Sequence, residues 1–317
     1  MKPSPNLSKP PRIVVLAATR RGYAFVERII ALLPECELTV FSFREELWEP
    51  PFFEDIKSFV ETRGHRFFEG KRVGDVRNAA VWDEKRFDLL FAVSWRFLVP
   101  ASVFQRSVRG AYVLHDSLLP EYRGFSPTVW AIINGEDHTG VTLFEMAEAM
   151  DFGPVVAQKR VPIGETETIA DVMERVTASY LSLLEDNLPA LLAGTAIRKV
   201  QNEDHATYCC KRLPSDNKIV WSRSARDLHN LIRAVGRPYP GAYVEVNGKT
   251  VIVWSASLPV RQLRYRGAIP GRVIEVLPGK GVIVLTGDGC IMLEKVDVGE
   301  GRTMAATDVF NQVGMTL

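Results

Sequence analysis

The first two thirds of the chain alternate short apolar runs with stretches of helical periodicity. The apolar or extended runs lie at residues 12–18, 36–43, 87–93, 111–114, 139–146 and 154–161. The helical stretches lie at residues 23–33, 53–63, 126–134 and 168–192. Strands that alternate with helices form a mostly parallel sheet, and continuous apolar runs are typical of strands buried on both faces. The sequence therefore predicts a Rossmann-like α/β fold with helices on both faces of the sheet.

The loop after the first predicted strand carries no dinucleotide fingerprint. It reads Ala18-Thr-Arg-Arg-Gly22 and lacks the G-x-G-x-x-G pattern whose glycines let the backbone approach a pyrophosphate. The fold type is therefore predicted without a bound dinucleotide. Arg20 and Arg21 in this loop face either a phosphate group or solvent, and both interpretations stay open.

The last third of the chain predicts a smaller, β-rich module. Residues 222–235 have the spacing of an amphipathic helix, in which His229 lies beside the apolar stripe and is expected to pack. Asn247-Gly248 is typical of a type I′ hairpin turn, because both positions of that turn favour positive φ. Short β-like runs surround it, at residues 242–246, 251–254, 271–276, 281–286 and 290–296. Several short strands at this spacing predict a barrel-like domain.

A length of 317 residues is enough for two domains. We expect a flexible leader at residues 1–11, the α/β domain at 12–200 and the β-rich C-terminal domain at 205–317. The apolar runs are far shorter than the ~20 residues of a membrane-spanning helix, so no membrane insertion is predicted.

The charge balance and the cysteine content limit the kinds of partner and the cellular compartment expected for this chain. Lys and Arg number 39 against 38 Asp and Glu, a formal net charge of +1, which argues against a general nucleic-acid binder. The four cysteines are few and badly spaced for a disulfide framework or a zinc site. The simplest expected location is therefore the cytoplasm.

His115 and Asp151 are the strongest catalytic candidates. His115 ends a predicted strand and begins a polar loop, which is where open parallel sheets place their active sites, and Asp151 stands at a predicted turn. A histidine with an orienting carboxylate can move protons near neutral pH. The residues alone leave a structural histidine as an equal alternative.

The segment from His115 to Gly153 carries a specific family resemblance. Its motifs are His-x-Ser-Leu-Leu-Pro-x-Tyr-Arg-Gly from His115, then Pro127, Trp130-Ala-Ile, Asn134-Gly-Glu, Thr139-Gly-Val-Thr and Met-Asp-x-Gly. This combination resembles the folate-dependent formyltransferase superfamily, which includes methionyl-tRNA formyltransferase. The sequence is most similar to the N-formyltransferases of nucleotide-linked amino sugars, such as the UDP-4-amino-4-deoxy-L-arabinose formyltransferase domain. Residues 221–241 and 287–289 resemble the small C-terminal domain of the longer members.

The resemblance implies a reaction and a set of site residues. The formyl group of 10-formyltetrahydrofolate, a co-substrate, would pass to an amine of a nucleotide-sugar, with no metal and with residues 12–200 as the catalytic domain. His115 and Asp151 would be catalytic. The folate site would comprise Ser94, Trp95, Arg96, Phe97, Met146 and Met150, and the acceptor would meet Ser117, Arg123 and Gly124. For Trp95 and Phe97 the side chains are expected to pack while the backbone of their loop binds the pterin. A homodimer is implied by resemblance alone.

One position departs from the family pattern. The family has asparagine two residues before the histidine, and this chain has Val113, which cannot donate a hydrogen bond to an oxyanion. Protonated His115 could carry the oxyanion with a backbone N–H or water, or Asp116 or Ser117 could have reorganised the site. Alternatively, the chain binds folate or a nucleotide without turnover. Methionyl-tRNA formyltransferase is a further alternative, although the near-neutral charge favours a small acceptor over tRNA.

Overall fold

The computed structural model describes residues 9–46, 50–75, 82, 86–260, 265–299 and 301–317. It contains two compact units that interleave along the chain. The first unit comprises residues 1–127, 139–161 and 174–209, and the second comprises 128–138, 162–173 and 210–317. The expected domain boundaries at 200 and 205 stay a prediction, and residues 1–8 of the expected leader lie outside the described residues. Within the described part of the chain, no helix combines the length and apolar character that crossing a bilayer would take.

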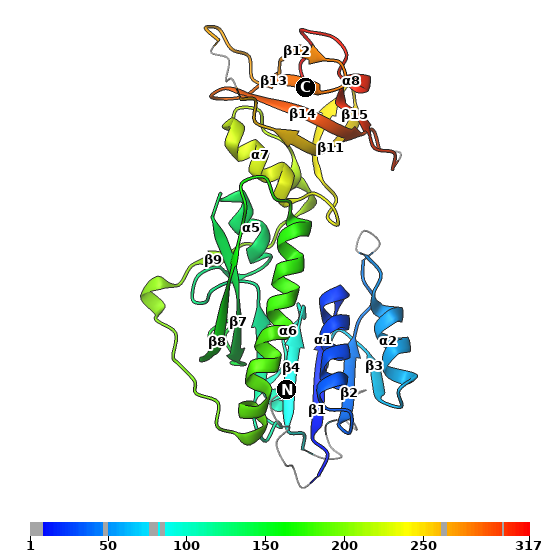
Figure 1. Cartoon of the computed structure of the whole chain (residues 1–317), viewed down its shortest axis with the longest axis vertical. Helices are drawn as coiled ribbons and strands as arrows, with labels where there is room; N and C mark the ends of the chain where they lie inside the picture. Colours follow the sequence, from blue (N-terminus) through cyan, green and yellow to red (C-terminus); the bar gives the residue numbers. More distant parts are fainter. Residues whose placement is uncertain (1–8, 47–49, 76–81, 83–85, 261–264, 300) are drawn as a thin grey trace. The chain divides into compact units, whose positions relative to one another are not determined.

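The first unit is built on a seven-stranded sheet (Figure 1). Its strands are β1 (Arg12–Ala17), β2 (Glu37–Ser42), β3 (Arg66–Glu69), β4 (Leu89–Val93), β5 (Ala111–His115), β7 (His138–Glu145) and β8 (Val155–Pro162). They lie in the order β3-β2-β1-β4-β5-β7-β8, and the pairings from β3 to β5 are parallel. β7 pairs antiparallel with β5, bringing Thr142 opposite His115. The mostly parallel sheet predicted from the alternation is confirmed.

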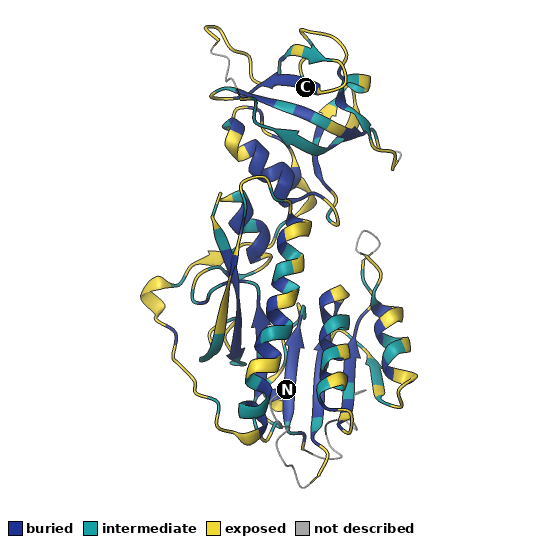
Figure 2. Ribbon diagram, in the orientation of Figure 1, coloured by how far each residue is buried: buried dark blue, intermediate teal, exposed yellow. Residues whose placement is uncertain are grey.

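Helices cover both faces of this sheet. They are α1 (Thr19–Leu32), α2 (Phe53–Glu61), α4 (Ala101–Phe104) and α6 (Ile169–Ala193), whereas α5 (Pro127–Ile133) falls almost wholly within the second unit. The ion pairs Arg20–Glu174 and Arg28–Glu185 join α1 to α6, so these two helices lie side by side on one face. Figure 2 shows their buried side toward the sheet and their exposed side toward solvent.

An apolar cluster fills the opposite face of the sheet and reaches the site. It contains Val14, Leu16, Phe41, Val73, Trp82, Phe87, Leu90, Ala92, Val103, Phe104 and Ala111. Val113, Trp95 and Met146 are partly buried and pack against it. The valine that replaces the family asparagine therefore extends the apolar cluster along β5 to two residues before His115.

The second unit is an antiparallel β module with one main helix. Its strands are β10 (Ala242–Val246), β11 (Lys249–Ser257), β12 (Val273–Leu277), β13 (Gly281–Leu285), β14 (Cys290–Asp297) and β15 (Met304–Ala305). They follow the order β10-β11-β14-β13-β12, with β15 on β14, and α7 (Ala225–Ala234) packs on β11 and β14. α8 (Ala306–Val309) follows β15. Asn247 and Gly248 have φ of +52° and +74°, which confirms the turn predicted between the first two strands.

Several short elements were not predicted from the sequence. They are the strand β3, the helix α4, the paired strands β6 (Arg123–Gly124) and β9 (Tyr208–Cys209), and β15 and α8 near the C-terminus. β6 and β9 are two residues each and lie 85 positions apart in sequence, so neither has a periodicity to detect. Two short 3-10 turns, Glu203–His205 and Pro214–Asn217, lie in the polar segment after α6.

His229 gives this module a testable pH dependence. It is buried on α7, as expected from its place beside the apolar stripe, and its Nδ1 makes no hydrogen bond among the described residues. Burial lowers the pKa of His229 below 6.5, and Arg233 and Arg226 lower it further against the opposing effect of Glu294. The unfolded chain therefore binds a proton more readily than the folded one just below pH 6.5, so this histidine makes stability fall as pH falls.

We expect the free energy of unfolding to decrease from about pH 7.5 to about pH 5.5 and to do so less steeply in His229→Gln. Urea unfolding at both pH values, followed by tryptophan fluorescence, measures the two slopes. The pH dependence that remains in His229→Gln comes from other groups such as His65. Burial also lowers the pKa of His65. Equal slopes in the two proteins would contradict this assignment.

Candidate active site

The sheet changes direction of winding between β1 and β4. The chain proceeds outward through β2 and β3 on one side of β1 and then crosses to β4 on the other. Open α/β sheets bind ligands at the carboxyl ends of the strands beside such a switch point. Thr19 follows β1 and Ser94 follows β4, and the Thr19 hydroxyl donates to the Ser94 hydroxyl oxygen over 3.2 Å. Ser94, predicted to begin the folate loop, therefore stands at this point.

Strained backbone gathers around the same edge. Six non-glycine residues among the described ones have positive φ, namely Thr19, Ser94, Tyr122, Ser126, Asp151 and Asn247. Asn247 belongs to the hairpin turn. Of the other five, Thr19 follows β1, Ser94 follows β4, Tyr122 and Ser126 come after β5, and Asp151 is itself a catalytic candidate. Such conformations persist where surrounding structure enforces them, and they cluster at functional sites.

His115 is held by the loop that follows it. It ends β5 and is 8% exposed, and its Nε2 lies 2.9 Å from the backbone carbonyl oxygen of Tyr122. A carbonyl oxygen only accepts, so Nε2 carries the hydrogen of this bond. Nδ1 is the nitrogen left to exchange a proton, and it lies 3.7 Å from Oδ2 of Asp151.

Asp151 is fixed from two sides. Its Oδ2 accepts a hydrogen bond of 2.8 Å from the backbone N–H of Gly124, and its φ is +55°. The loop then passes so close to β7 that a Cβ on Gly153 would lie 1.7 Å from the carbonyl oxygen of Glu145. The structure thus brings together the two residues that the sequence nominated, although 36 positions separate them.

Gly153→Ala is expected to disturb this arrangement. The added methyl group meets backbone rather than a side chain, so the Asp151 loop must move. Overpacking of this kind costs about 1–3 kcal/mol of stability, and a shift of ~1 Å in a catalytic group can cost about 10²-fold in rate. Thermal unfolding and activity assays measure both effects. Gly236→Ala is the matched control, because its added Cβ meets only Ile232 O at an ordinary 3.5 Å; equal behaviour of the two variants would contradict the close contact.

Two sequence models of one family match this chain. The model described as formyl transferase matches residues 44–186, and the one described as formyl transferase, C-terminal domain, matches residues 213–314. Together the matches take in most of the chain, including His115 and Asp151. The chain belongs to the formyltransferase superfamily. The resemblance drawn from the sequence is confirmed, and with it the class of enzyme, a formyltransferase.

Solved structures of the same fold include formyltransferases of sugars. WlaRD, a sugar 3N-formyl transferase solved in the presence of dTDP and 5-N-formyl-THF, is 17% identical with a TM-score of 0.68, and the match covers 89% of this chain and 97% of WlaRD. An N-formyltransferase from Helicobacter canadensis, solved with folinic acid and dTDP-3-aminofucose, is 16% identical with a TM-score of 0.69, covering 89% and 98%. At these identities the likeness shows the fold.

The fold also matches part of a longer protein. A variant of HypX from Aquifex aeolicus is 19% identical with a TM-score of 0.63, and the match covers 96% of this chain and 49% of HypX. Another HypX structure was solved in complex with tetrahydrofolic acid. The formyltransferase described here therefore spans about half the length of the HypX chains it matches.

All three residues predicted to meet the acceptor make hydrogen bonds within the protein itself. The buried Ser117 hydroxyl donates to Glu121 O over 2.6 Å, which closes the turn after His115. Arg123 is 1% exposed and donates to Glu203 and to Gln201. Its hydrogen bonds with Glu203 lower the pKa of that carboxyl group and raise the pKa of the guanidinium. Gly124 uses its N–H for Asp151.

The predicted folate loop packs on an aromatic cluster. The rings of Trp95 and Phe97 lie 5.3 and 4.9 Å from that of Phe43, and Arg96 stacks over Phe43 at 4.8 Å. These side chains pack as expected, while Ser94 has the positive φ that turns the backbone at the strand end. Of the two methionines predicted for the opposite wall, Met146 is partly buried against the apolar cluster and Met150 is exposed. Their role in folate binding remains a prediction.

Arg21 and Asp116 form a buried ion pair on the far side of the β5 end. Arg21 is 6% exposed and lies 2.6 Å from Asp116 Oδ2, so it faces neither solvent nor an open phosphate site, whereas Arg20 is exposed to solvent beside Glu174. Tyr180 on α6 donates to Leu114 O over 2.8 Å and also to Asp116. Burial raises the pKa of Tyr180 well above 10, and the Asp116 carboxylate raises it further. The Asp116 carboxylate is thereby engaged with Arg21 and with Tyr180, which donates to the β5 backbone.

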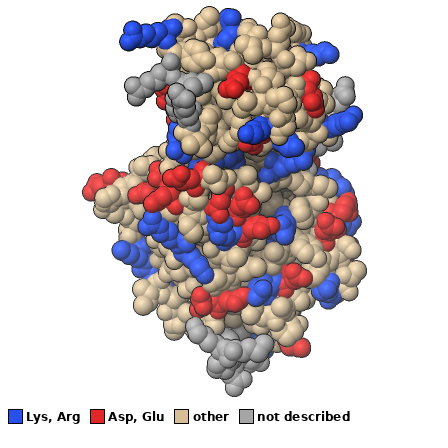
Figure 3. Space-filling view, turned by 45° about the horizontal axis from the view of Figure 1, so that its top comes forward, with Lys and Arg blue, Asp and Glu red and all other residues tan. Residues whose placement is uncertain are grey.

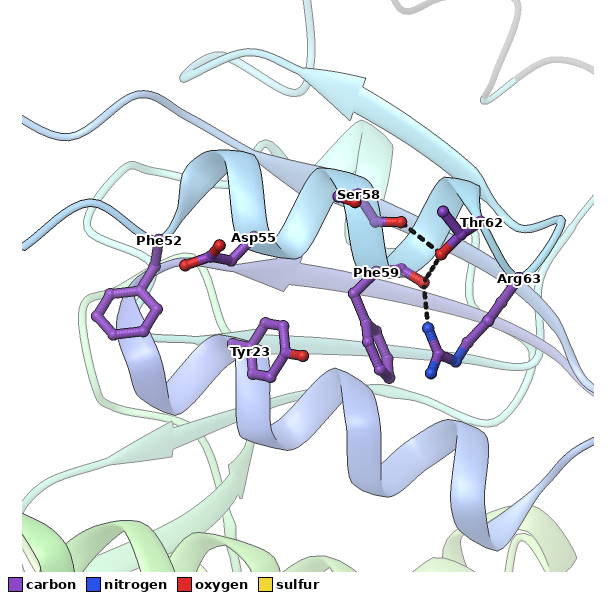
Figure 4. Close-up of a pocket in the computed structure, with 7 residues that line it drawn as sticks. All are labelled: Tyr23, Phe52, Asp55, Ser58, Phe59, Thr62 and Arg63. Carbon is purple, nitrogen blue, oxygen red and sulfur yellow. Dashed lines mark hydrogen bonds between the residues drawn. The ribbon is translucent and has the colours of Figure 1, made fainter.

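A separate hollow lies between α1 and α2, with a volume of about 410 Å³ (Figure 4). Tyr23, Phe52, Asp55, Ser58, Phe59, Thr62 and Arg63 line it. The side chains of Thr62 and Arg63 donate hydrogen bonds to backbone carbonyl oxygens of α2. None of the lining residues belongs to the site built around His115.

The described residues contain no group of three or more His, Cys, Asp or Glu side chains placed to hold a metal ion. Acidic side chains lie among the basic ones on the face shown in Figure 3, which matches the near-neutral net charge.

Proposed function

We propose that this formyltransferase moves the formyl group of 10-formyltetrahydrofolate to the amine of a nucleotide-linked amino sugar. The observation that carries the proposal is the His115–Asp151 pair, held at the carboxyl ends of parallel strands by the loop that contains Tyr122 and Gly124. Support for the donor and the acceptor comes from WlaRD and the Helicobacter canadensis enzyme, whose structures hold formyl-THF or folinic acid with dTDP or a dTDP-sugar.

The proposed reaction needs a base and an acid in succession. The acceptor nitrogen attacks the formyl carbon, and the tetrahedral intermediate carries negative charge on the formyl oxygen. The attacking nitrogen then loses a proton, the bond from the formyl carbon to N10 of the folate breaks, and N10 gains a proton. The products are the N-formyl amine and tetrahydrofolate, so atoms and charge balance.

In this scheme His115 moves the proton through Nδ1. Its Nε2–H stays on Tyr122 O, while Asp151 faces Nδ1 across 3.7 Å, which is too long for a direct hydrogen bond. The Asp151 carboxylate favours the imidazolium that forms when Nδ1 takes up the proton of the attacking nitrogen, and this imidazolium is then the acid that protonates N10. A positioned proton-transfer group of this kind is worth about 10²–10⁴ in rate.

Val113 supports a second candidate, a formyltransferase-like protein that binds folate without turnover. Its side chain belongs with the apolar cluster beside Trp95 and Met146, where the family pattern has a hydrogen-bond donor. Loss of one oxyanion donor costs about 10²–10³ in rate. In Val113→Asn a large gain in rate would indicate an impaired site, while a further loss would show that the local packing is built around valine.

The acceptor experiment separates the two candidates. The purified chain is incubated with 10-formyltetrahydrofolate and, in turn, UDP-, dTDP- and GDP-linked amino sugars and methionyl-tRNA, and products are followed by mass spectrometry. We expect one acceptor to gain a formyl group in step with release of tetrahydrofolate. Formylation of methionyl-tRNA instead would favour the tRNA alternative, and binding of folate with no formylated product would favour the non-catalytic one.

A further inference from the structure

Gln201 lies outside every motif that carries the family resemblance, in the polar segment after α6, yet it binds the loop of Asp151. Its Nε2 donates to the backbone carbonyl oxygen of Asp151 over 2.9 Å and to that of Gly153 over 2.7 Å. The side chain is buried. Both amide hydrogens of Gln201 are therefore used to fix the backbone on either side of Phe152.

The other end of the same amide binds Arg123. Gln201 Oε1 accepts from Nη2 over 2.6 Å and from Nε over 3.3 Å. Glu203 binds the two terminal nitrogens of Arg123 at 2.8 and 2.7 Å, and the guanidinium lies 5.1 Å from the ring centre of Phe152. Every hydrogen-bonding atom of the Gln201 amide thus has a partner, and a buried network that is satisfied throughout is rigid.

Three consecutive residues connect this network to the catalytic pair. Tyr122 accepts from His115 through its carbonyl, Arg123 binds Gln201 through its side chain, and Gly124 donates to the Asp151 carboxylate through its N–H. The segment that contains Gln201 continues into β9, which pairs with Arg123 and Gly124 of β6. A displacement of Gln201 therefore acts on Asp151 directly, through the two carbonyls of its loop, and also through Arg123 and the adjoining Gly124 N–H.

We propose that Gln201 is a positioning residue for formyl transfer, which sets the Asp151 carboxylate against Nδ1 of His115. The expected effect on kcat rests on the proposed function. The expected effect on the Gly124 N–H is independent of the proposed function. Without the Gln201 amide, two buried carbonyl oxygens lose their donor, and the Asp151 loop has to move to regain one. The hydrogen bond from Gly124 to Asp151 loosens as a result.

The test compares two substitutions at Gln201 with one at its neighbour. Gln201→Met keeps the length and removes all hydrogen bonds. Gln201→Glu keeps an acceptor for Arg123 but turns a carboxylate toward the carbonyls of Asp151 and Gly153, so it isolates the donor half. Asn202→Ala is the matched control, because the hydrogen bond of the Asn202 side chain among the described residues is the one it accepts from Asp204 N within the same segment.

Two readouts are taken on the full chain, namely kcat and KM for formyl transfer and the hydrogen-exchange rate of the Gly124 amide by NMR. We expect both Gln201 variants to lower kcat about 10–100-fold with KM for the formyl donor within about twofold, and to speed Gly124 exchange about tenfold or more. Asn202→Ala should stay within about twofold of the wild type in both readouts.

The outcomes are separable. Unchanged Gly124 exchange in Gln201→Met and Gln201→Glu overturns the proposal, whatever kcat does. An unchanged kcat in variants whose Gly124 exchange is faster also overturns it, because Asp151 would then have moved without consequence. If the wild-type chain itself transfers no formyl group, the proposed function fails, and Gly124 exchange still decides whether Gln201 positions Asp151.

Discussion

His115→Gln is expected to lower kcat for formyl transfer by about 10²–10⁴. Glutamine can still donate to Tyr122 O, so the turn after β5 keeps its hydrogen bond, but an amide neither takes up nor releases a proton near neutral pH. Steady-state kinetics with a confirmed acceptor measures the loss. The binding of 5-formyltetrahydrofolate, a stable isomer of the donor, should change little, because the proposed folate loop follows β4.

His138→Gln is the control for the loss of an imidazole. His138 contacts the neighbouring Asp137 and has no part in the site. It should keep the wild-type kcat. A His115→Gln variant as active as His138→Gln would remove His115 from the mechanism and return it to the structural interpretation that the sequence left open.

Asp151→Asn is expected to lower kcat by about 10² or more while leaving the fold intact. Asparagine tolerates the left-handed backbone at φ +55° at least as well as aspartate, and its carbonyl oxygen can still accept from the Gly124 N–H. The substitution therefore removes the negative charge beside Nδ1 of His115 and little else. In a catalytic Ser-His-Asp triad, which contains a comparable His–Asp pair, the Asp-to-Asn substitution lowers kcat about 10⁴-fold.

The measurement pairs kcat with the melting temperature. An unchanged melting temperature with a large loss of kcat supports an electrostatic role of the carboxylate. A loss of kcat that parallels a loss of stability would instead show that Asp151 acts through the loop structure, and full activity of Asp151→Asn would exclude it from the chemistry.

Much of the architecture was predictable because the signals are local and periodic. Continuous apolar runs gave the buried strands β1, β4 and β5, and the Asn247-Gly248 pair gave the hairpin of the second unit. The antiparallel addition of β7 to β5 was not predicted, since the strand-type pattern at 139–146 says nothing about direction.

The site was predictable only where residue type and motif coincide. His115 and Asp151 were found from a strand end, a turn and the family motif, and the structure places them 3.7 Å apart. Gln201 was missed, since a single glutamine in a polar segment carries no signal of what it contacts. Arg21 was misjudged for the same reason, because its partner Asp116 lies 95 positions away in sequence.

Isothermal titration of the purified chain with 5-formyltetrahydrofolate asks whether the site binds the formyl donor before any acceptor is known. We expect saturable binding at micromolar concentration with one site per chain, despite Val113 in the middle of β5. No heat of binding at high ligand concentration would contradict it and would leave a formyltransferase fold that serves another ligand.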